Sequence, residues 1–260
     1  MLSYQHHYHA GNPADVHKHA LLAWMLGYLT AKDKPLSYIE THAGRGLYDL
    51  RDPAALRTGE AASGIGRLEP RLPADHPYRR CLDAARAAHG PSAYPGSPLI
   101  ATQMLRPSDR LHLAELHPGE HARLTETLAA ASATIRRQDG FDMALSLCPP
   151  SPRRGMVFSD PSYEVKDEYD TIPATLGQLA RKWNVGVLVL WYPILADNRH
   201  RPMLDRLVHL FPAGLRHEVG FAPVRAGHRM TGSGLFVVNP PYGLAAEAAR
   251  IAATVFGAQG

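Results

Sequence analysis

Segments with the pattern of strands alternate with segments with the pattern of helices over most of this 260-residue chain. Strands are expected at 36–40, 111–115, 134–138, 155–159 and 185–192, and helices at about 13–29, 118–130, from 141, 172–183 and 198–210. Two more strands, 215–221 and 234–239, follow one another with no helix between them. This order predicts an α/β fold with a mostly parallel seven-stranded sheet, Rossmann-like, that ends in an antiparallel hairpin. Seven strands with such a hairpin match the class I methyltransferase sheet, whereas a nicotinamide enzyme would more often show six parallel strands.

One long interval interrupts this alternation. The strand at 111–115 begins 65 positions after Gly46, and an ordinary connection between parallel strands needs far fewer residues. The interval contains two expected helices, at about 59–68 and 77–89, and Ser97 is placed to cap a third that begins at Pro98. We therefore expect a main domain formed by residues 1–47 and 94–260, with residues 48–93 inserted as a small helical subdomain.

The charge balance is compatible with a nucleic-acid partner. The chain has a formal net charge of +4 and a pI near 9.1, and 23 of its 28 basic residues are arginine. The planar arginine fork bonds phosphate groups bidentately and stacks on bases. A general bias toward arginine codons would give the same excess, so composition alone does not identify a partner.

Cysteine usage and hydropathy predict a cytoplasmic protein. Cys81 and Cys148 lie far apart without a CxxC pattern, which excludes a disulfide framework and a cysteine zinc site. No apolar run is long enough to cross a bilayer, and the first residues lack the apolar core of a signal peptide.

Acidic residues and glycines gather where the expected strands end. In open α/β sheets, ligands bind beyond the carboxyl ends of the strands. Those ends carry Glu40 with Gly44 and Gly46, then Glu115, Asp139 and Asp160. Gly44 and Gly46 alone would also fit a tight turn, but four successive strands that each end in an acid indicate a binding site. Glycine lets a ligand approach the backbone, an acid after the second strand can bind both ribose hydroxyls, and one after the third can bind an adenine amino group. These features, and the absence of a longer phosphate-binding loop, predict S-adenosylmethionine as the cofactor.

The stretch Asp160-Pro161-Ser162-Tyr163 resembles the (D/N/S)PP(Y/F/W) motif of amino-group methyltransferases. An adenine amino nitrogen is a poor nucleophile because its lone pair is delocalised into the ring. If Asp160 and the carbonyl of Pro161 each accept one of its N–H bonds, the nitrogen can pyramidalise and direct its lone pair at a methyl donor. Tyr163 is then placed to stack on an extruded base. An ordinary turn after a strand is the alternative interpretation, since Asp-Pro often begins a turn.

Asn239-Pro240-Pro241-Tyr242 is a closer literal match to the same motif. Its strand is expected to run antiparallel to its neighbours, however, so its carboxyl end falls on the edge of the sheet opposite the cofactor. We therefore assign the catalytic role to Asp160 and interpret Asn239 as the end of a strand.

Two further segments are candidates for contact with RNA. The N-terminus is rich in histidine, but no carboxylate or cysteine lies at a spacing typical of a metal site, so we expect no metal. We instead expect a basic and aromatic lip over the site, formed by Tyr4, His6 and Lys18. The segment 225–232, with Arg225 and Arg229, is the second candidate; a solvated hairpin loop is the alternative reading.

The sequence as a whole resembles the bacterial 23S ribosomal RNA adenine-N6 methyltransferases that carry a small helical insertion. The resemblance spans nearly the whole chain and includes 1–4, 9–12, 15–16, 18–19, 41–44, 94–98, 115–118, 139–141, 190–193 and 230–231. It implies a cofactor pocket lined by His19, His42, Ser97, Glu115, Asp139, Gly140 and Asp160, with Asp160 catalytic and Tyr4 against the substrate. It also implies 23S ribosomal RNA as the partner, and we expect the chain to act as a monomer.

One position departs from the family pattern, which is Asp-Pro-Pro-Tyr. Ser162 replaces the second proline and leaves Pro161 freer to turn, because proline restrains the residue before it. Two alternatives to an RNA methyltransferase stay open: a DNA adenine-N6 methyltransferase, and a cofactor-binding, RNA-binding protein that has lost catalysis through Ser162.

Overall fold

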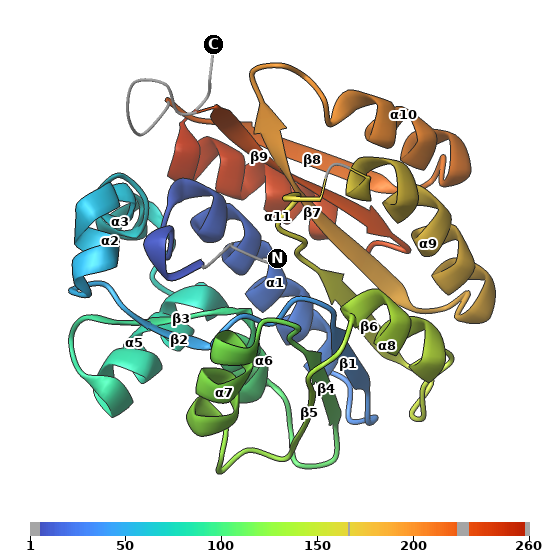
Figure 1. Cartoon of the computed structure of the whole chain (residues 1–260), viewed down its shortest axis with the longest axis horizontal. Coiled ribbons are helices and arrows are strands. Elements are labelled where there is room, and N and C mark those ends of the chain that lie inside the picture. The colour runs from blue at the N-terminus through green and yellow to red at the C-terminus, as the bar shows by residue number, and fades with distance from the viewer. Residues whose placement is uncertain (1–5, 166, 223–228, 258–260) are drawn as a thin grey trace.

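The computed structural model describes residues 6–165, 167–222 and 229–257. Its main sheet consists of β1 (Ser37–Glu40), β4 (Arg110–Ala114), β5 (Ala133–Arg136), β6 (Gly155–Ser159), β7 (Val187–Leu195), β8 (Leu215–Gly220) and β9 (Met230–Val238). The helices of eight or more residues are α1 (Pro13–Thr30), α5 (Pro77–His89), α6 (Ser97–Met104), α7 (Pro118–Thr127), α8 (Gly140–Leu147), α9 (Glu168–Lys182), α10 (Arg201–Leu210) and α11 (Leu244–Ile251). These strands and helices form three layers, with the sheet in the middle (Figure 1).

The sheet has the order β5-β4-β1-β6-β7-β9-β8. The five strands from β5 to β7 run parallel, whereas β9 is antiparallel to both β7 and β8. The prediction of a seven-stranded class I methyltransferase sheet with a terminal antiparallel hairpin is confirmed. The strand order reverses beside β1, because β4 lies on one side of it and β6 on the other. Ligands bind at such a reversal in open α/β sheets.

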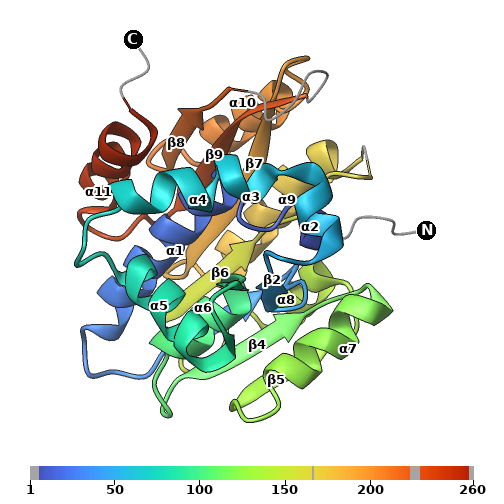
Figure 2. The same cartoon turned by 90° about the vertical axis from the view of Figure 1, so that its left-hand side faces the viewer.

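Two hydrophobic cores cover the two faces of the sheet. One core packs α1, α5, α6 and α11 against one face, and the other packs α8, α9 and α10 against the opposite face (Figures 1 and 2). Helix α1 is buried along most of its length. It begins where predicted, because the Asn12 side chain accepts a hydrogen bond from the Asp15 amide and Pro13 takes the first helical position.

The segment between β1 and β4 contains more elements than the sequence predicts. Two short strands, β2 (Leu47–Asp49) and β3 (Ala93–Pro95), pair antiparallel at the two ends of residues 50–92. The helix expected at 59–68 is instead divided into α3 (Glu60–Ser63) and α4 (Ile65–Leu68), preceded by α2 (Pro53–Thr58). Gly59 ends α2 in the left-handed conformation at φ 67°, and Gly64 separates the next two turns, so one continuous helix does not form.

Two other details differ from expectation. Helix α11 and the π-helical turn Ala252–Phe256 follow β9, where no helix was predicted. Ser97 is the first residue of α6 and not its cap, because Gly96 occupies the cap position and the Ser97 hydroxyl bonds to Glu40.

Candidate active site

A cavity of about 480 Å³ lies at the carboxyl ends of the parallel strands. Its wall includes the loops that follow β1, β4, β5 and β6, the end of β7 and the first turns of α1. The volume falls within the range of about 300–1,000 Å³ that is typical of small-molecule sites. The cavity therefore occupies the position that the strand-end residues predict for a ligand.

The Asp160–Tyr163 loop forms one wall of this cavity. Asp160, Pro161, Ser162 and Tyr163 all line it. Tyr163 has a left-handed backbone conformation at φ 56°, which is strained for a bulky residue and is found mainly at functional sites. Its hydroxyl donates a hydrogen bond to the Trp191 carbonyl at 2.8 Å, and its ring stacks on Tyr169 with the ring centres 4.6 Å apart. One face of the ring predicted to stack on a base is thus already covered by Tyr169.

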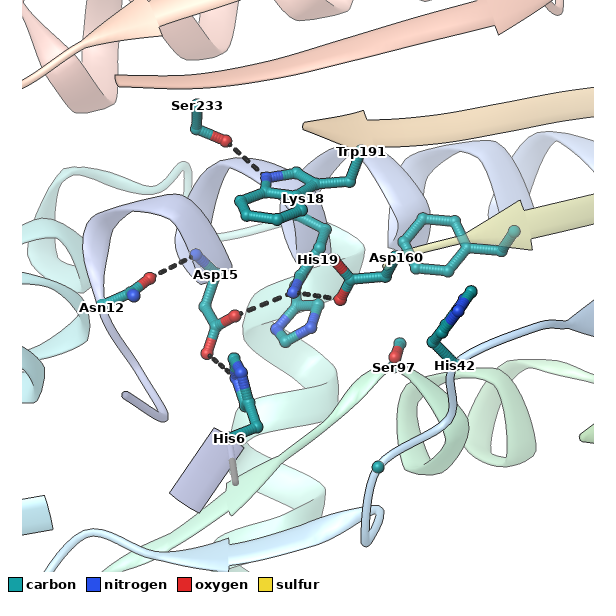
Figure 3. Close-up of polar contacts among 12 residues, drawn as sticks. His6, Asn12, Asp15, Lys18, His19, His42, Ser97, Asp160, Trp191 and Ser233 are labelled. Atoms are coloured by element: carbon teal, nitrogen blue, oxygen red, sulfur yellow. Dashed lines mark hydrogen bonds and ion pairs between the residues drawn. The ribbon is translucent and has the colours of Figure 1, made fainter. Parts of the chain in front are cut away.

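Lys18 connects two carboxylates beside this loop. Its Nζ lies 2.5 Å from Asp160 Oδ2, 3.0 Å from Asp15 Oδ1 and 5.2 Å from the centre of the Trp191 ring (Figure 3). Burial alone would lower the pKa of Lys18, but Asp15 and Asp160 outweigh burial and raise it above its usual value. Lys18 therefore stays cationic. It is buried at 3% exposure and lies in the cavity wall, deeper than the lip over the site that was expected to include it.

Asp15 also holds the segment that precedes α1. Its Oδ2 accepts hydrogen bonds from the Gly11 amide and from His6 Nε2, each at 2.9 Å. Burial would raise the pKa of Asp15, but His6 and Lys18 more than offset it and hold the pKa well below its usual range. Asp15 is therefore an ionised, buried carboxylate in contact with two cavity residues.

The loops after β1 and β4 are joined by Glu115. Its Oε2 accepts the amide of Gly44 at 2.8 Å, and its Oε1 accepts the amide of His117 at 2.7 Å. Burial raises the pKa of Glu115. Each carboxylate oxygen keeps a second lone pair, which is the arrangement needed to accept two further hydroxyl hydrogen bonds.

The loop after β5 requires a glycine. Asp139 caps α8 by accepting the Asp142 amide at 3.0 Å, which leaves its second oxygen for other donors. A Cβ on Gly140 would lie 1.8 Å from the Thr41 carbonyl oxygen, a distance that no side chain can occupy. Only glycine lets the loops after β1 and β5 meet at this point.

Glu40 lies directly beneath the cavity. Ser97 and Tyr38 donate hydroxyl hydrogen bonds to its two carboxylate oxygens. Burial raises the pKa of Glu40 to about 8, although both hydroxyls act in the opposite direction. Glu40 itself does not line the cavity, whereas Ser97 does.

Two histidines of the cavity are neutral. Burial lowers the pKa of His19 to about 3 and that of His42 to about 4, although nearby carboxylates act in the opposite direction. His19 Nδ1 pairs with the Tyr94 hydroxyl at 3.1 Å, and His42 Nδ1 pairs with Thr41 Oγ1 at 2.7 Å. At neutral pH both imidazoles therefore offer hydrogen bonds without a charge.

Most of the residues predicted from the sequence meet in this cavity. Those that line it are His6, Lys18, His19, His42, Gly44, Ser97, Glu115, Asp139, Gly140, Asp160, Pro161 and Tyr163. Gly46 does not, because its turn packs against α7 and its carbonyl accepts the amide of Gly96. Arg229 is exposed next to the lining residue Met230, and its carbonyl accepts the amide of Ala196. Tyr4 and Arg225 lie outside the described residues.

Asn239 lies at the opposite edge of the sheet, as the strand directions require. Its Nδ2 donates to the carbonyls of Asn184 and Gly186, just before β7 begins, at 3.0 and 2.9 Å. It has a left-handed φ of 53°. Asn239 therefore ends a strand and takes no part in the cavity.

Among the cavity residues that were given no role from the sequence, three stand out chemically: Trp191, Asp15 and Glu168. The position of Trp191 near the end of the strand expected at 185–192 was the available signal, although β7 itself continues to Leu195. Asp15 lies in a segment, 15–16, that the family resemblance includes, but no role was expected for it. Glu168 Oε2 is buried and finds no hydrogen-bond partner within the described part of the chain, and burial raises the pKa of Glu168 to about 6. An unpartnered buried oxygen in a cavity wall indicates a place where a ligand donor binds.

Among residues 6–165, 167–222 and 229–257, no group of three or more His, Cys, Asp or Glu side chains is arranged to hold a metal ion. No helix in those ranges combines the length and hydropathy needed to cross a bilayer.

Comparisons with known proteins agree with this geometry. The chain is 38% identical to ribosomal RNA large subunit methyltransferase J of Escherichia coli K12, over 94% of this chain and 89% of that protein. It is 35% identical to the Haemophilus influenzae protein of the same name, over 96% and 92%. A crystallised protein of Legionella pneumophila superposes with a TM-score of 0.86 at 36% identity, covering 96% of this chain and 95% of that one.

A more distant comparison concerns the fold alone. A probable spermidine synthase of Corynebacterium glutamicum superposes with a TM-score of 0.52 at 14% identity, covering 93% of this chain and 73% of that one.

The family model described as "Ribosomal RNA large subunit methyltransferase D, RlmJ" matches residues 33–256, which include most of the cavity wall. The chain therefore belongs to the RlmJ family of ribosomal RNA large subunit methyltransferases.

Proposed function

We propose that this protein transfers a methyl group from S-adenosylmethionine to the N6 amino group of an adenine in 23S ribosomal RNA. The observation that carries the proposal is that one cavity brings Asp160, Pro161 and Tyr163 together with Glu115 and Asp139. This places a base-binding loop beside a nucleoside-binding wall. Membership of a ribosomal RNA methyltransferase family supports the choice of RNA over DNA.

The cavity wall fits the proposed cofactor. The paired amide bonds of Glu115 leave two lone pairs for a ribose, and Asp139 keeps one free oxygen for an amino group. Gly44 and Gly140 keep the backbone accessible. S-adenosylmethionine has no phosphate to bind, and Lys18, the only lysine among the described residues of the wall, is already paired with two acids. His19, His42, Ser97 and Asp160 complete the set of residues that would hold the cofactor. When bound, S-adenosylmethionine supplies an electrophilic methyl group on a sulfonium.

Asp160 and Pro161 are the residues that act on the nucleophile. The Asp160 carboxylate and the Pro161 carbonyl each accept one N–H of the amino group, which weakens conjugation of the nitrogen with the ring. The lone pair of the nitrogen then becomes available, and the charge that develops on the amino group lies beside a carboxylate. Tyr163 stacks on the base with the ring face that Tyr169 does not cover.

The substrate side of the site includes His6 and Lys18 in the cavity and Arg229 near its rim. Tyr4 and Arg225 belong to the same proposal from the sequence alone.

Residues 48–93 are proposed to be an inserted subdomain on a methyltransferase domain of residues 1–47 and 94–260; the pairing of β2 with β3 at its base supports this division. We also propose that the protein acts as a monomer in the cytoplasm, where two buried free cysteines are stable.

The test is methyl transfer to defined nucleic acids. Purified protein with labelled S-adenosylmethionine should convert adenosine in unmodified 23S ribosomal RNA to N6-methyladenosine, as measured by mass spectrometry of nucleosides. Unmodified genomic DNA is the matched alternative substrate. Transfer to DNA in place of RNA would favour a DNA methyltransferase, and cofactor binding without transfer to either would favour a non-catalytic RNA-binding protein.

A further inference from the structure

Lys18 is bonded to a carboxylate oxygen of Asp160, the residue on which the proposed reaction depends. Its ammonium lies 2.5 Å from Asp160 Oδ2, and the Asp160 side chain is only 14% exposed. Asp160 must offer a lone pair to the amino group of the base, yet a buried cation that is paired with it alone would hold that carboxylate tightly.

The second partner of Lys18 removes this difficulty. Asp15 Oδ1 lies 3.0 Å from Nζ, and the side chain of Asp15 is 2% exposed. Asp15 is fixed from two other directions, by the Gly11 amide and by His6 Nε2 (Figure 3). A fixed carboxylate can keep the ammonium in place when Asp160 turns to another donor.

We infer that Asp15 is a positioning residue for the methyl transfer proposed above: it retains Lys18 while Asp160 binds the amino group, and it fixes His6 at the same time. Asp15 makes no contact with Asp160 itself and acts through the lysine. Lys18 has three N–H donors, so it can serve both acids at once and give one up without losing its charge partner.

Asp15→Asn tests this inference. The oxygen of the asparagine side chain can still accept the hydrogen bond from the Gly11 amide. Its NH2 group would replace Oδ1, however, and its N–H donors would face the N–H donors of the Lys18 ammonium. Lys18 should then pair with Asp160 alone. The expected result is at least a tenfold fall in the single-turnover rate on a 23S ribosomal RNA fragment at saturating RNA, with S-adenosylmethionine affinity within about threefold of wild type. Asp15→Ser, which keeps a hydroxyl acceptor for Gly11, serves as the second variant if Asp15→Asn does not fold.

Asp109→Asn is the matched control. Asp109 is also a buried aspartate that accepts backbone amides and pairs with an arginine, but it lies where β4 begins, at the other edge of the sheet. The control should unfold at a lower temperature and keep the wild-type single-turnover rate when folded. A rate loss of similar size in both variants would mean that any buried aspartate matters, and it would overturn a specific role for Asp15.

A second readout follows the lysine itself. The titratable groups around Lys18 are Asp15, Asp160, Glu40 and His19. Asp15→Asn should lower the pKa of Lys18, observed as the titration of its ¹³Cε resonance, because one of the two carboxylates that raise this pKa has lost its charge. An unchanged titration would mean that Asp15 does not hold Lys18, and it would overturn the inference. Equal transfer rates in wild type and Asp15→Asn would overturn the inference alone. Absence of transfer by the wild type would overturn the proposed function and the inference with it.

Discussion

The carboxylate of Glu115 accepts the amide of Gly44 at 2.8 Å, and this bond joins the loops after β4 and β1 across the mouth of the cavity. The two residues are 71 positions apart in the chain. Burial raises the pKa of Glu115, while the amides of His117 and Gly44 oppose that rise. The bond orients both oxygens of Glu115 before any ligand arrives, which reduces the entropy cost of binding.

Glu115→Ala should weaken S-adenosylmethionine binding strongly. Two charge-assisted hydrogen bonds to ribose would be lost, which costs about 2–4 kcal/mol after partial replacement by water. That corresponds to roughly a 30- to 800-fold rise in Kd. Isothermal calorimetry measures it, with Glu126→Ala as a control, since Glu126 is exposed on α7 and pairs only with Arg123 among the described contacts. Wild-type affinity in the Glu115 variant would contradict the assignment.

Gly140→Ala should damage both stability and cofactor binding. Its Cβ would lie 1.8 Å from the Thr41 carbonyl oxygen, so one of the two loops must move. The expected loss in free energy of unfolding is about 1–3 kcal/mol, as for other overpacked sites. Gly27→Ala in α1 is the control, because its Cβ would meet only Met104 at 3.6 Å and alanine favours helices. Denaturant unfolding in which both variants match wild type would show that the contact is not tight.

Much of the fold follows from local sequence patterns. The strand at 155–159 forms as predicted, and the antiparallel course of β9 could be deduced because no helix separates it from β8. The strands β2 and β3 could not be predicted, because three-residue strands carry too little periodicity and exist only by pairing with each other. Helix α11 was not predicted. It begins at Leu244, shortly after Pro240 and Pro241, and those prolines were interpreted only as part of the segment that ends a strand.

The candidate site was predictable where topology alone brings residues together. Acids at the ends of parallel strands must share one edge of the sheet, which is why Glu115, Asp139 and Asp160 could be grouped in advance. The roles of Asp15 and Lys18 depend instead on a contact between α1 and the loop after β6 across 142 positions, which no periodicity encodes. Even the family resemblance left Asp15 without a role.

Asp160→Ala should abolish methyl transfer, whereas Asn239→Ala should leave the turnover of folded protein within severalfold of wild type. Asp160 lines the cavity, and Asn239 bonds to backbone carbonyls at the opposite edge of the sheet. The Asn239 variant should instead lose about 1–3 kcal/mol of stability, since two hydrogen bonds of about 0.5–1.5 kcal/mol each are removed. Single-turnover rates and thermal unfolding separate the two effects. An inactive Asn239 variant beside an active Asp160 variant would reverse the assignment of the two motifs.

Glu40 should make stability fall as pH rises toward 8. Its pKa is about 8 in the folded chain because of burial, against about 4.3 for an unperturbed glutamate. Between these values the folded chain keeps a proton that the unfolded chain has released, so the free energy of unfolding falls as pH rises through that window. One pKa unit corresponds to about 1.4 kcal/mol, which makes the effect on the order of a few kcal/mol.

Glu40→Gln isolates this contribution, because glutamine stays neutral and can still bond to Ser97 and Tyr38. The difference in free energy of unfolding, variant minus wild type, should rise between about pH 5 and pH 8 and then level off. Urea unfolding of both proteins across that range measures it. Two parallel stability curves would show that Glu40 is already ionised near neutral pH.

Ser162→Pro should raise the methylation rate several-fold without changing cofactor affinity. The substitution restores the family pattern and restrains Pro161, whose carbonyl is the proposed acceptor. Its structural cost is small: the Ser162 hydroxyl accepts only a long bond of 3.5 Å from the Glu164 amide, and no bond from the Ser162 amide is found within the described residues. A restrained loop spends more time in the competent position, and the rate rises in proportion to that population.

Ser162→Ala is the control, since it removes the hydroxyl without adding the ring and should match wild type. A fall in rate for the proline variant alone would mean that the amide of Ser162 is needed during catalysis. No transfer by any form, despite tight cofactor binding, would instead mean that this chain binds RNA without methylating it.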